Sequence, residues 1–457
     1  MTIVSDTANA RRKSAISYQS LVNAAFATFI FFGMMSLIEP SPYDFMSLIA
    51  IPLWALGGFS IHRSQILILF LWCIFEAAGF AALMPYWDEA DPRLYQFQSL
   101  YLFVTVIFFT LFFAQRTEQR AELCLRAYTA GAVLSAIIGI LGYFDVGGLA
   151  AALTTVEGRV SGTFKDPNVL GSYLILSSTF LLQRLLVGAT KWRLTTFAAL
   201  LLSLIGTFVS YSRGSWGGTI LSLGLMTIAT YVTSETRRTR RRIVLMTCLA
   251  MGLCLLALLA ILSQQETRDF FLQRATLTQD YDEGVTGRFG NQIRSLPLLL
   301  EHPEGLGPLR FRLIFGLEPH NSYIGAFAND GWIGGFAWIL LVATSVFVGF
   351  RLMFAQSPYR GFAQIFFSTL FALLLQGFQI DVDHWRQAFL CFGAVWGLEA
   401  ARQRWMARER AAHSRYQAIS DLAKPACSPD ERVQTHESQW SRSSTNMEAP
   451  LLCPKKP

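Results

Sequence analysis

Long apolar runs separated by polar loops extend over most of the chain. Twelve can be delimited, mostly about 16 to 25 residues long, and a helix of that length crosses roughly 30 Å of hydrocarbon. Because lipid offers no hydrogen-bond partners to the backbone, such runs cross membranes as helices. The pattern predicts an all-α, polytopic membrane protein with about twelve transmembrane helices, at residues 19–38, 45–60, 65–84, 97–114, 123–144, 167–187, 194–211, 214–232, 243–263, 324–350, 362–380 and 385–401.

The loops between these runs alternate in charge. Basic residues precede the first run and recur in every second loop, most densely in RRTRRR at 237–242, whereas Asp88, Glu89 and Asp91 lie in an intervening loop. Cytoplasmic loops of membrane proteins carry an excess of Lys and Arg. We therefore expect a multi-pass protein of the bacterial inner membrane, with both termini in the cytoplasm and the opposite loops facing the periplasm.

Composition agrees with this class. Of the 457 residues 53% are hydrophobic and 15% are charged, against the roughly 25% charged residues of soluble domains. The net charge of +7 follows from the basic loops, so it predicts contact with membrane lipids and no nucleic-acid partner. Seven cysteines without CxxC spacing suggest neither a zinc site nor a disulfide framework.

The runs also suggest how the chain is organised. Residues 1–18 are expected to form a cytoplasmic N-terminal segment, and residues 19–401 a transmembrane domain. One large periplasmic loop, residues 264–323, is expected between the ninth and tenth helices. Residues 402–457 are predicted to be a cytoplasmic tail that begins as a short amphipathic helix and is otherwise disordered, because it is polar and rich in Ser and Pro.

Arginines on the predicted outer face are candidate binding residues, namely Arg159, Arg213, Arg288 and Arg294. Such residues commonly extend to lipid phosphates or pair with nearby acids. Arg213, however, lies between two apolar runs, where a charge is costly unless an anion meets it. The large outer loop contains six arginines and no lysine, and a planar guanidinium suits a pair of phosphates better than an ammonium does.

His320 is the candidate catalytic residue. It lies where the outer loop re-enters the membrane, beside the hydrogen-bonding residues Asn321 and Ser322. An unperturbed imidazole, with a pKa of about 6.5, is largely neutral at pH 7 and can accept a proton from a hydroxyl group. Asn321 is grouped with the arginines as a substrate-binding candidate. His384 follows Asp381 and Asp383 and precedes Arg386, so it is interpreted as part of a local ion-pair cluster.

No metal site and no cofactor are predicted. The outer acids and histidines lack the spacing of known metal-binding motifs, and the glycine-rich stretches lack the phosphate-loop pattern.

Four stretches together resemble the O-antigen ligase and polymerase superfamily of bacterial inner-membrane proteins. They are GRVSGTFKDPNVLGSYL at 158–174, SYSRGSWGG at 210–218, GRFGNQIRSLPLLLEHPEGLGP at 287–308 and HNSYIGAFANDGWIGG at 320–335. With the apolar runs, the resemblance covers most of residues 20–400.

The resemblance implies a metal-independent glycosyltransferase, inverting in its ligase members. Its donor is a glycan on a polyprenyl diphosphate, and its acceptor is a sugar hydroxyl of another lipid- or glycan-linked molecule. Arg213 and Arg288 would hold the diphosphate with help from Arg159, and His320 would act as the base. Other polysaccharide assembly proteins are further candidate partners.

Several alternatives stay open. Glu301, Glu304 and Glu318 are rival bases, and Glu318 could instead orient His320. Ligase and polymerase use the same donor chemistry, so the family does not separate them. A twelve-helix transporter or lipid-glycan flippase would show two related halves and polar groups at mid-membrane. A non-catalytic assembly partner is a third class.

Overall fold

The computed structural model describes residues 17–155, 158–263, 265, 268, 284 and 287–422. The chain divides into two compact units, Met1–Met406 and Ala407–Pro457. Within the described ranges the secondary structure is helical, apart from an isolated bridge between Thr154 and Val160. The α-helices are α2 (Tyr18–Phe31), α3 (Pro42–Ala55), α4 (Arg63–Leu83), α5 (Ala90–Phe113), α6 (Thr117–Tyr143), α7 (Ala150–Leu153), α8 (Pro167–Val187), α9 (Arg193–Val209), α10 (Arg213–Thr233), α11 (Arg237–Ser263), α13 (Arg288–Glu301), α14 (Phe311–Phe315), α15 (Ser322–Phe354), α16 (Arg360–Gln376) and α17 (Arg386–Leu422). Short 3-10 helices are η2 (Phe32–Met34), η3 (Met84–Tyr86) and η4 (Val146–Gly148).

The helical membrane-protein class is confirmed. Each of the twelve predicted runs overlaps one of these α-helices. Five of the described helices are long and apolar enough to cross a membrane, namely Arg63–Tyr86, Ala90–Phe113, Thr117–Tyr143, Pro167–Val187 and Ser322–Phe354. The number of twelve spans stays a prediction.

Several helices extend beyond the apolar runs that predicted them. Helix α5 begins at Ala90 instead of near 97, α6 begins at Thr117, and α17 continues to Leu422. Apolar residues mark only the part of a helix that is buried in lipid or protein, whereas polar residues such as Gln, Glu and Arg continue the helix beyond it. The predicted outer loop at 264–323 contains α13 and α14, and its residues 269–283 lie outside the described part.

Polar side chains cap three helices that begin near one another. Asp166 accepts from the backbone N–H of Asn168 before α8, and Pro167 occupies the first helical position. Ser212 caps α10 by accepting from the N–H of Ser215. Asn321 caps α15. A capping side chain satisfies backbone donors that have no partner in the first turn, so these sequences fix where each helix starts.

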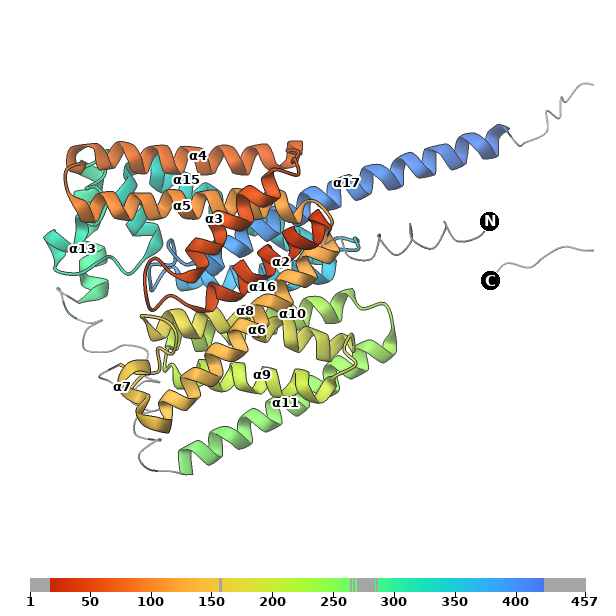
Figure 1. Cartoon of the computed structure of the whole chain (residues 1–457), viewed down its shortest axis with the longest axis horizontal. Helices are drawn as coiled ribbons and strands as arrows, with labels where there is room; N and C mark the ends of the chain where they lie inside the picture. The colour runs from red at the N-terminus through yellow and green to blue at the C-terminus, as the bar shows by residue number, and fades with distance from the viewer. Residues whose placement is uncertain are drawn as a thin grey trace, which may run out of the picture. The chain divides into compact units, whose positions relative to one another are not determined.

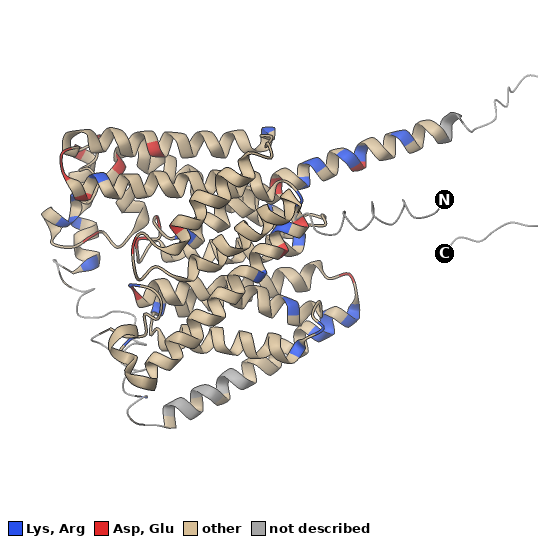
Figure 2. Ribbon diagram, viewed as in Figure 1, with Lys and Arg blue, Asp and Glu red and all other residues tan. Residues whose placement is uncertain are grey.

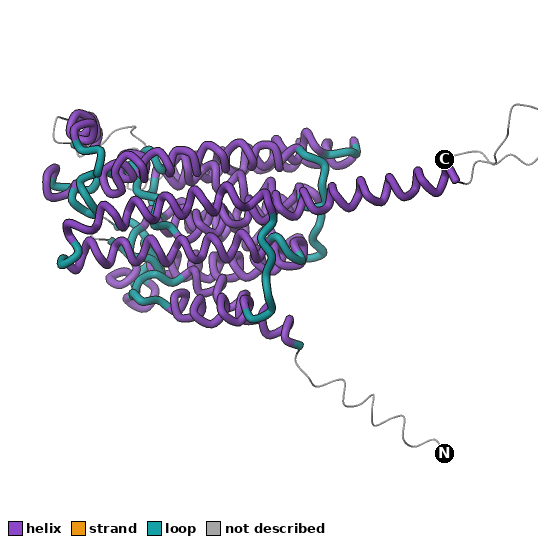
Figure 3. Tube along the Cα trace, turned by 90° about the horizontal axis from the view of Figure 1, so that it is seen from above, coloured by secondary structure: helices purple, strands orange, loops and turns teal. Residues whose placement is uncertain are grey.

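The helices of residues 17–406 pack side by side (Figures 1 and 3), with α4 along α15 and α8 against α9, α10 and α16. Small residues allow close approach: a Cβ on Gly206 of α9 would lie 2.9 Å from Ala136 of α6. Close helix contact through small residues is typical of membrane proteins, where dispersion replaces the hydrophobic effect between helices.

The two ends of this bundle differ in charge (Figure 2). Three basic connections lie at one end: the loop from α8 to α9 carries Lys191, α11 begins with RRTRRR at 237–242, and α16 begins with Arg360. The caps of α8, α10 and α15 lie at the opposite end, together with α13. The outer-face candidates of the sequence therefore share the end that faces away from these basic loops.

Candidate functional site

A cavity of about 230 Å³ lies at this second end. Arg159, Arg213, Arg288 and His320 all line it, so four of the six predicted site residues come together. They are separated by up to 161 residues in the sequence but meet where α10, α13 and α15 begin. The remaining lining residues are Asp166, Asn168, Ser172, Tyr211, Ser212, Gly214, Gln376, Gln379, Ile380 and Trp385. We call this the arginine cavity.

Arg159 approaches the cavity from the loop before α8. Its Nε donates to the carbonyl of Ser210 at 3.2 Å, and its Nη2 donates to Oδ1 of Asn168 at 2.8 Å. The loop itself is held by the N–H groups of Ser161 and Gly162, which both donate to the Leu153 carbonyl. Amide and carbonyl acceptors carry no net charge, so these contacts orient the guanidinium.

Arg213 is the first residue of α10, directly after the Ser212 cap. One glycine that follows it, Gly218, leaves room for a side chain of α16, because a Cβ there would lie 2.1 Å from Nε2 of Gln376. Gln376 uses the space to donate to the Gly214 carbonyl at 2.6 Å. The SRGSWGG sequence thus brings the start of α10 against α16 and sets Arg213 at the cavity.

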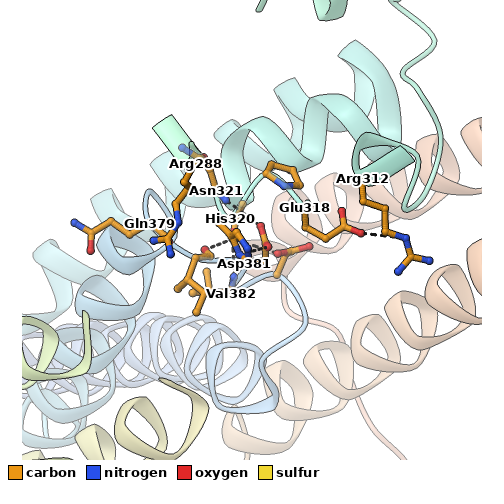
Figure 4. Close-up of polar contacts among 12 residues, drawn as sticks. Arg288, Arg312, Glu318, His320, Asn321, Gln379, Asp381 and Val382 are labelled. Atoms are coloured by element: carbon orange, nitrogen blue, oxygen red, sulfur yellow. Dashed lines mark hydrogen bonds and ion pairs between the residues drawn. The ribbon is translucent and has the colours of Figure 1, made fainter. Parts of the chain in front are cut away.

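Arg288 is the first residue of α13 and donates to the Gln379 carbonyl at 3.2 Å (Figure 4). Two amides attach α13 to the segment before His320. Asn291 donates to the Phe315 carbonyl at 3.2 Å, and Gln292 donates to the Pro319 carbonyl at 2.9 Å.

Arg294 does not line the cavity. Its Nη1 donates to Oδ1 of Asn291 at 3.2 Å, and its guanidinium lies 5.7 Å from the centre of the Phe315 ring. Six residues along a helix of 3.6 residues per turn is about 1.7 turns, so Arg288 and Arg294 point in different directions. Of the two, Arg288 lines the cavity, and a ligand-binding role for Arg294 stays a prediction.

His320 adopts a left-handed backbone conformation, with φ of 47°, immediately before the cap of α15. Such a conformation is uncommon for a residue with a side chain. The N–H of Asn321 donates to Oδ1 of Asp381 at 2.9 Å, and Nδ1 of His320 lies 3.5 Å from Oδ2 of the same carboxylate. The latter is an ion-pair separation, longer than an ordinary hydrogen bond. One carboxylate therefore contacts both residues of this turn.

Asn321, for which substrate binding stays a prediction, caps α15 in the structure. Its side-chain oxygen accepts from the N–H groups of Tyr323 at 3.0 Å and Ile324 at 3.1 Å. Its Nδ2 donates to the Phe378 carbonyl at 3.3 Å. The residue does not line the arginine cavity, because its amide is committed to the helix cap.

The turn between α16 and α17, residues 377–385, contacts Arg288, His320 and the start of α15 (Figure 4). The Gln379 carbonyl accepts from Arg288, and Asp381 contacts His320. The Gly377 carbonyl accepts from the N–H of Ser322 at 2.8 Å, and the Val382 N–H donates to Oγ of Ser322 at 2.7 Å. This short turn thus positions α15 and α13 together.

Asp381 is the site residue that the sequence did not single out. It had been grouped with Asp383, His384 and Arg386 as one local cluster. The structure separates that group. Asp381 contacts His320, whereas Arg386 pairs with Asp44, through Nη2 at 2.8 Å from Oδ1. Only proximity in space relates Asp381 to a histidine 61 positions earlier, so no spacing in the sequence reveals it.

Asp383 and His384 do form the predicted pair, at 3.2 Å. Burial alone would raise the pKa of Asp383, but the hydrogen bond and charge of His384 and the Tyr95 hydroxyl hold that pKa below its ordinary value. Burial would lower the pKa of His384, whereas Asp383 raises it above its ordinary value. Opposite charges favour each other's charged form.

The three rival glutamates lie outside the lining of the cavity. Glu318 lies 3.6 Å from Nε of Arg312, and burial together with the charge of Asp381 raises its pKa above the ordinary value. Glu304 pairs with His302 at 2.9 Å. Glu301 ends α13. Within the described part of the chain, none of the three forms an ion pair with His320.

Two glycine motifs interlock beside the site. Helix α15 is interrupted at Gly331, whose φ of 67° leaves the helical range. The freed carbonyl of Ala328 accepts from the N–H of Leu306 at 2.7 Å, and the Trp332 N–H donates to the Pro303 carbonyl at 2.9 Å. A Cβ on Gly305 would lie 2.6 Å from the Gly331 nitrogen. The HPEGLG and NDGWIGG stretches therefore fold against each other.

Among the residues that the structure describes, the arginine cavity is lined by three arginines and one aspartate, Asp166. Fixed guanidiniums in a concave, partly dehydrated site favour an anionic ligand, above all one with paired phosphate oxygens. Within the described residues, no group of three or more His, Cys, Asp or Glu could hold a metal ion.

The fold and this site define a multi-pass, helical membrane protein with an arginine-lined cavity at one end of its bundle. Residues 198–339 match the family described as O-Antigen ligase, which confirms the resemblance to the O-antigen ligase and polymerase superfamily. The match includes Arg213, Arg288 and His320, but not Arg159 or Asp381. It supports an enzyme of the glycan ligase or polymerase type. No curated protein matches the chain.

Proposed function

We propose that the protein transfers a glycan from a polyprenyl-diphosphate carrier to a sugar hydroxyl of an acceptor glycan, as an O-antigen ligase or a surface polysaccharide polymerase. The observation that carries this proposal is the meeting of Arg159, Arg213, Arg288 and His320 around one cavity. Three cations and one potential base are what this reaction requires when a diphosphate departs and a hydroxyl attacks.

The arginines would bind the diphosphate. When the bond between the anomeric carbon and the phosphate oxygen breaks, its electron pair moves to the diphosphate, so negative charge grows there in the transition state. Cations held in place beforehand stabilise that charge more than they stabilise the ground state. A diphosphate is a weak base and leaves without a general acid, so a second carboxylate of the glycosidase kind is unnecessary.

His320 would accept the proton of the attacking hydroxyl. Its Nδ1 faces Asp381, which favours the tautomer with the proton on Nδ1 and leaves the lone pair of Nε2 for the base role. The acceptor oxygen then bonds to the anomeric carbon as its proton moves to Nε2. Asp381 stabilises the imidazolium that forms and keeps the ring oriented, and thus acts as a positioning residue.

The charge pattern supports one orientation in the membrane. With the α8–α9 loop and the basic starts of α11 and α16 in the cytoplasm, the arginine cavity would open on the periplasmic side of the inner membrane. Residues 19–401 would then form the catalytic membrane domain, with 264–323 in the periplasm and with 1–18 and 402–457 in the cytoplasm.

Two arginines of α13 provide a matched test. Arg288→Ala and Arg294→Ala remove the same side chain from the same helix, but only Arg288 lines the cavity. In a host that lacks its own copy of the gene, Arg288→Ala should abolish glycan transfer, measured as polysaccharide on gels, at an unchanged amount of membrane protein. Arg294→Ala should keep it. Equal transfer in both variants would contradict the proposed diphosphate site.

A further inference from the structure

A second, larger cavity of about 760 Å³ adjoins the arginine cavity, and the two share Asp166 and Trp385 as lining residues. It lies among residues 33–40, the first half of α5, the start of α8 and the start of α17. Its volume falls within the roughly 300 to 1,000 Å³ of ordinary ligand sites. We call it the adjoining cavity. Its position next to His320 and the three arginines makes its lining chemistry relevant to transfer.

The cations of the adjoining cavity are paired. Nζ of Lys165 lies 3.0 Å from Oε2 of Glu39, and Nη2 of Arg386 lies 2.8 Å from Oδ1 of Asp44. Both pairs belong to the lining. Because Lys165 and Arg386 each face a carboxylate, the adjoining cavity has no excess of cations that would attract an anion. Its ligand is therefore expected to be a neutral part of the substrate.

One buried polar group indicates the chemistry of this neutral part of the substrate. Within the part of the chain that the structure describes, the side-chain nitrogen of Gln387 makes no hydrogen bond, although this residue is 4% exposed and lines the adjoining cavity. A buried amide without a partner costs free energy, and a ligand oxygen would supply the missing acceptor. Gln98 and Tyr101 add further polar groups to the lining, and Trp385 adds an aromatic surface. Hydroxyl groups on a partly apolar ring suit this combination.

We propose that the adjoining cavity binds the sugar residues next to the point of transfer, with Gln387 donating a hydrogen bond to a sugar oxygen. This proposal rests on the proposed function and adds the place of the glycan to it. The sugars can belong to the acceptor or to the donor, because both carry the same hydroxyl-rich rings. The shared boundary at Asp166 and Trp385 puts either of them beside the diphosphate and His320.

Two substitutions test the adjoining cavity with matched controls. Gln387→Leu removes the amide at similar volume. Leu37→Trp fills the cavity from an exposed position, and Ile38→Trp adds the same bulk at the next position, which is exposed and outside the lining. Purified variants in proteoliposomes are assayed by initial rate, once against acceptor concentration at saturating donor and once against donor concentration at saturating acceptor.

We expect Gln387→Leu to raise one of the two KM values about fivefold, the effect of one lost hydrogen bond, and Leu37→Trp to raise the same KM at least as much. A rise for the acceptor assigns the adjoining cavity to the acceptor, and a rise for the donor assigns it to the donor glycan. Unchanged KM values in both variants, or an equal effect of Ile38→Trp, would overturn the proposal while transfer itself persists.

A binding measurement separates this proposal from the proposed function. Saturation-transfer NMR with the free oligosaccharide released from the host's own lipid-linked glycan reports binding without catalysis. Binding to the parent protein that is lost in Leu37→Trp and kept in Ile38→Trp supports the adjoining cavity, even if no transfer occurs. Binding of equal strength to all three proteins, or to none, overturns it.

Discussion

Replacing Asp381 with asparagine keeps the size of the side chain and removes the charge that faces His320. The asparagine oxygen can still accept the Asn321 N–H that Asp381 accepts at 2.9 Å, so the turn should keep its shape. In the proposed reaction His320 gains a proton in the transition state. The loss of a negative charge 3.5 Å from Nδ1 should therefore slow transfer more than it weakens substrate binding.

The size of this effect follows from distance and exposure. Two unit charges about 4 Å apart attract by about 1 kcal/mol in water and about 4 kcal/mol near a protein surface. The side chains of His320 and Asp381 are 40% and 34% exposed, and solvent screening places the value toward the low end, at about 1 to 2 kcal/mol. Since about 1.4 kcal/mol is a tenfold change in rate, kcat should fall about 5- to 30-fold.

The assay is transfer of radiolabelled glycan from polyprenyl diphosphate by purified protein in proteoliposomes, with kcat measured at saturating donor and acceptor. Asp145→Asn is the matched control. Asp145 accepts from the Ala150 N–H at 3.0 Å and lines neither the arginine cavity nor the adjoining cavity, so its kcat should equal that of the parent. An unchanged kcat in Asp381→Asn, or the same loss in both variants, would refute the positioning role.

Three further outcomes are expected. The transfer rate of Glu318→Gln should stay within about threefold of the parental rate, because Glu318 faces Arg312 and lies outside the arginine cavity. A rate lowered more than about 100-fold, as expected on loss of a general base, would instead assign the base role to Glu318. Gly305→Ala should destabilise the protein by at least about 1 kcal/mol and so lower its thermal midpoint in detergent. The φ of Gly305 is 84°, and a Cβ there would lie 2.6 Å from the backbone nitrogen of Gly331. An unchanged midpoint would contradict the close packing of the HPEGLG and NDGWIGG stretches. The pKa of His384 is raised above its ordinary value, so the charged imidazole stabilises the fold fully below about pH 6.5, and this stabilisation is lost as pH rises through the raised pKa. The thermal midpoints of the parent and His384→Gln should therefore converge with rising pH. A difference between the two midpoints that does not change with pH would contradict the charged pair with Asp383.

Hydrophobic patterning predicted the helices well because burial in lipid imposes the same requirement on every span. It missed the polar ends of α5 and α6, where helix propensity continues without apolar residues, whereas the amphipathic helix expected after residue 401 is the continuation of α17. The arginines of the predicted outer face could also be singled out from the sequence, because basic residues are depleted on that face of membrane proteins. Three of the four line one cavity.

The remaining features of the site depend on contacts between distant residues. Arg294 looked equivalent to Arg288 in the sequence, but the turn of α13 directs it toward Phe315. Asn321 looked like a binding residue because it follows His320, yet its amide caps α15. Asp381 came into the site only through the turn between α16 and α17. Such assignments require three-dimensional positions, which local patterns do not contain.

The central claim is that His320 is the base in glycan transfer within an arginine-lined cavity. The most direct test is transfer by purified protein in proteoliposomes, from a polyprenyl-diphosphate glycan to an acceptor glycan, with a metal chelator present. The parent should form product, and His320→Ala should form it at least about 100-fold more slowly at equal donor binding. Product formation by His320→Ala at the parental rate would contradict the account.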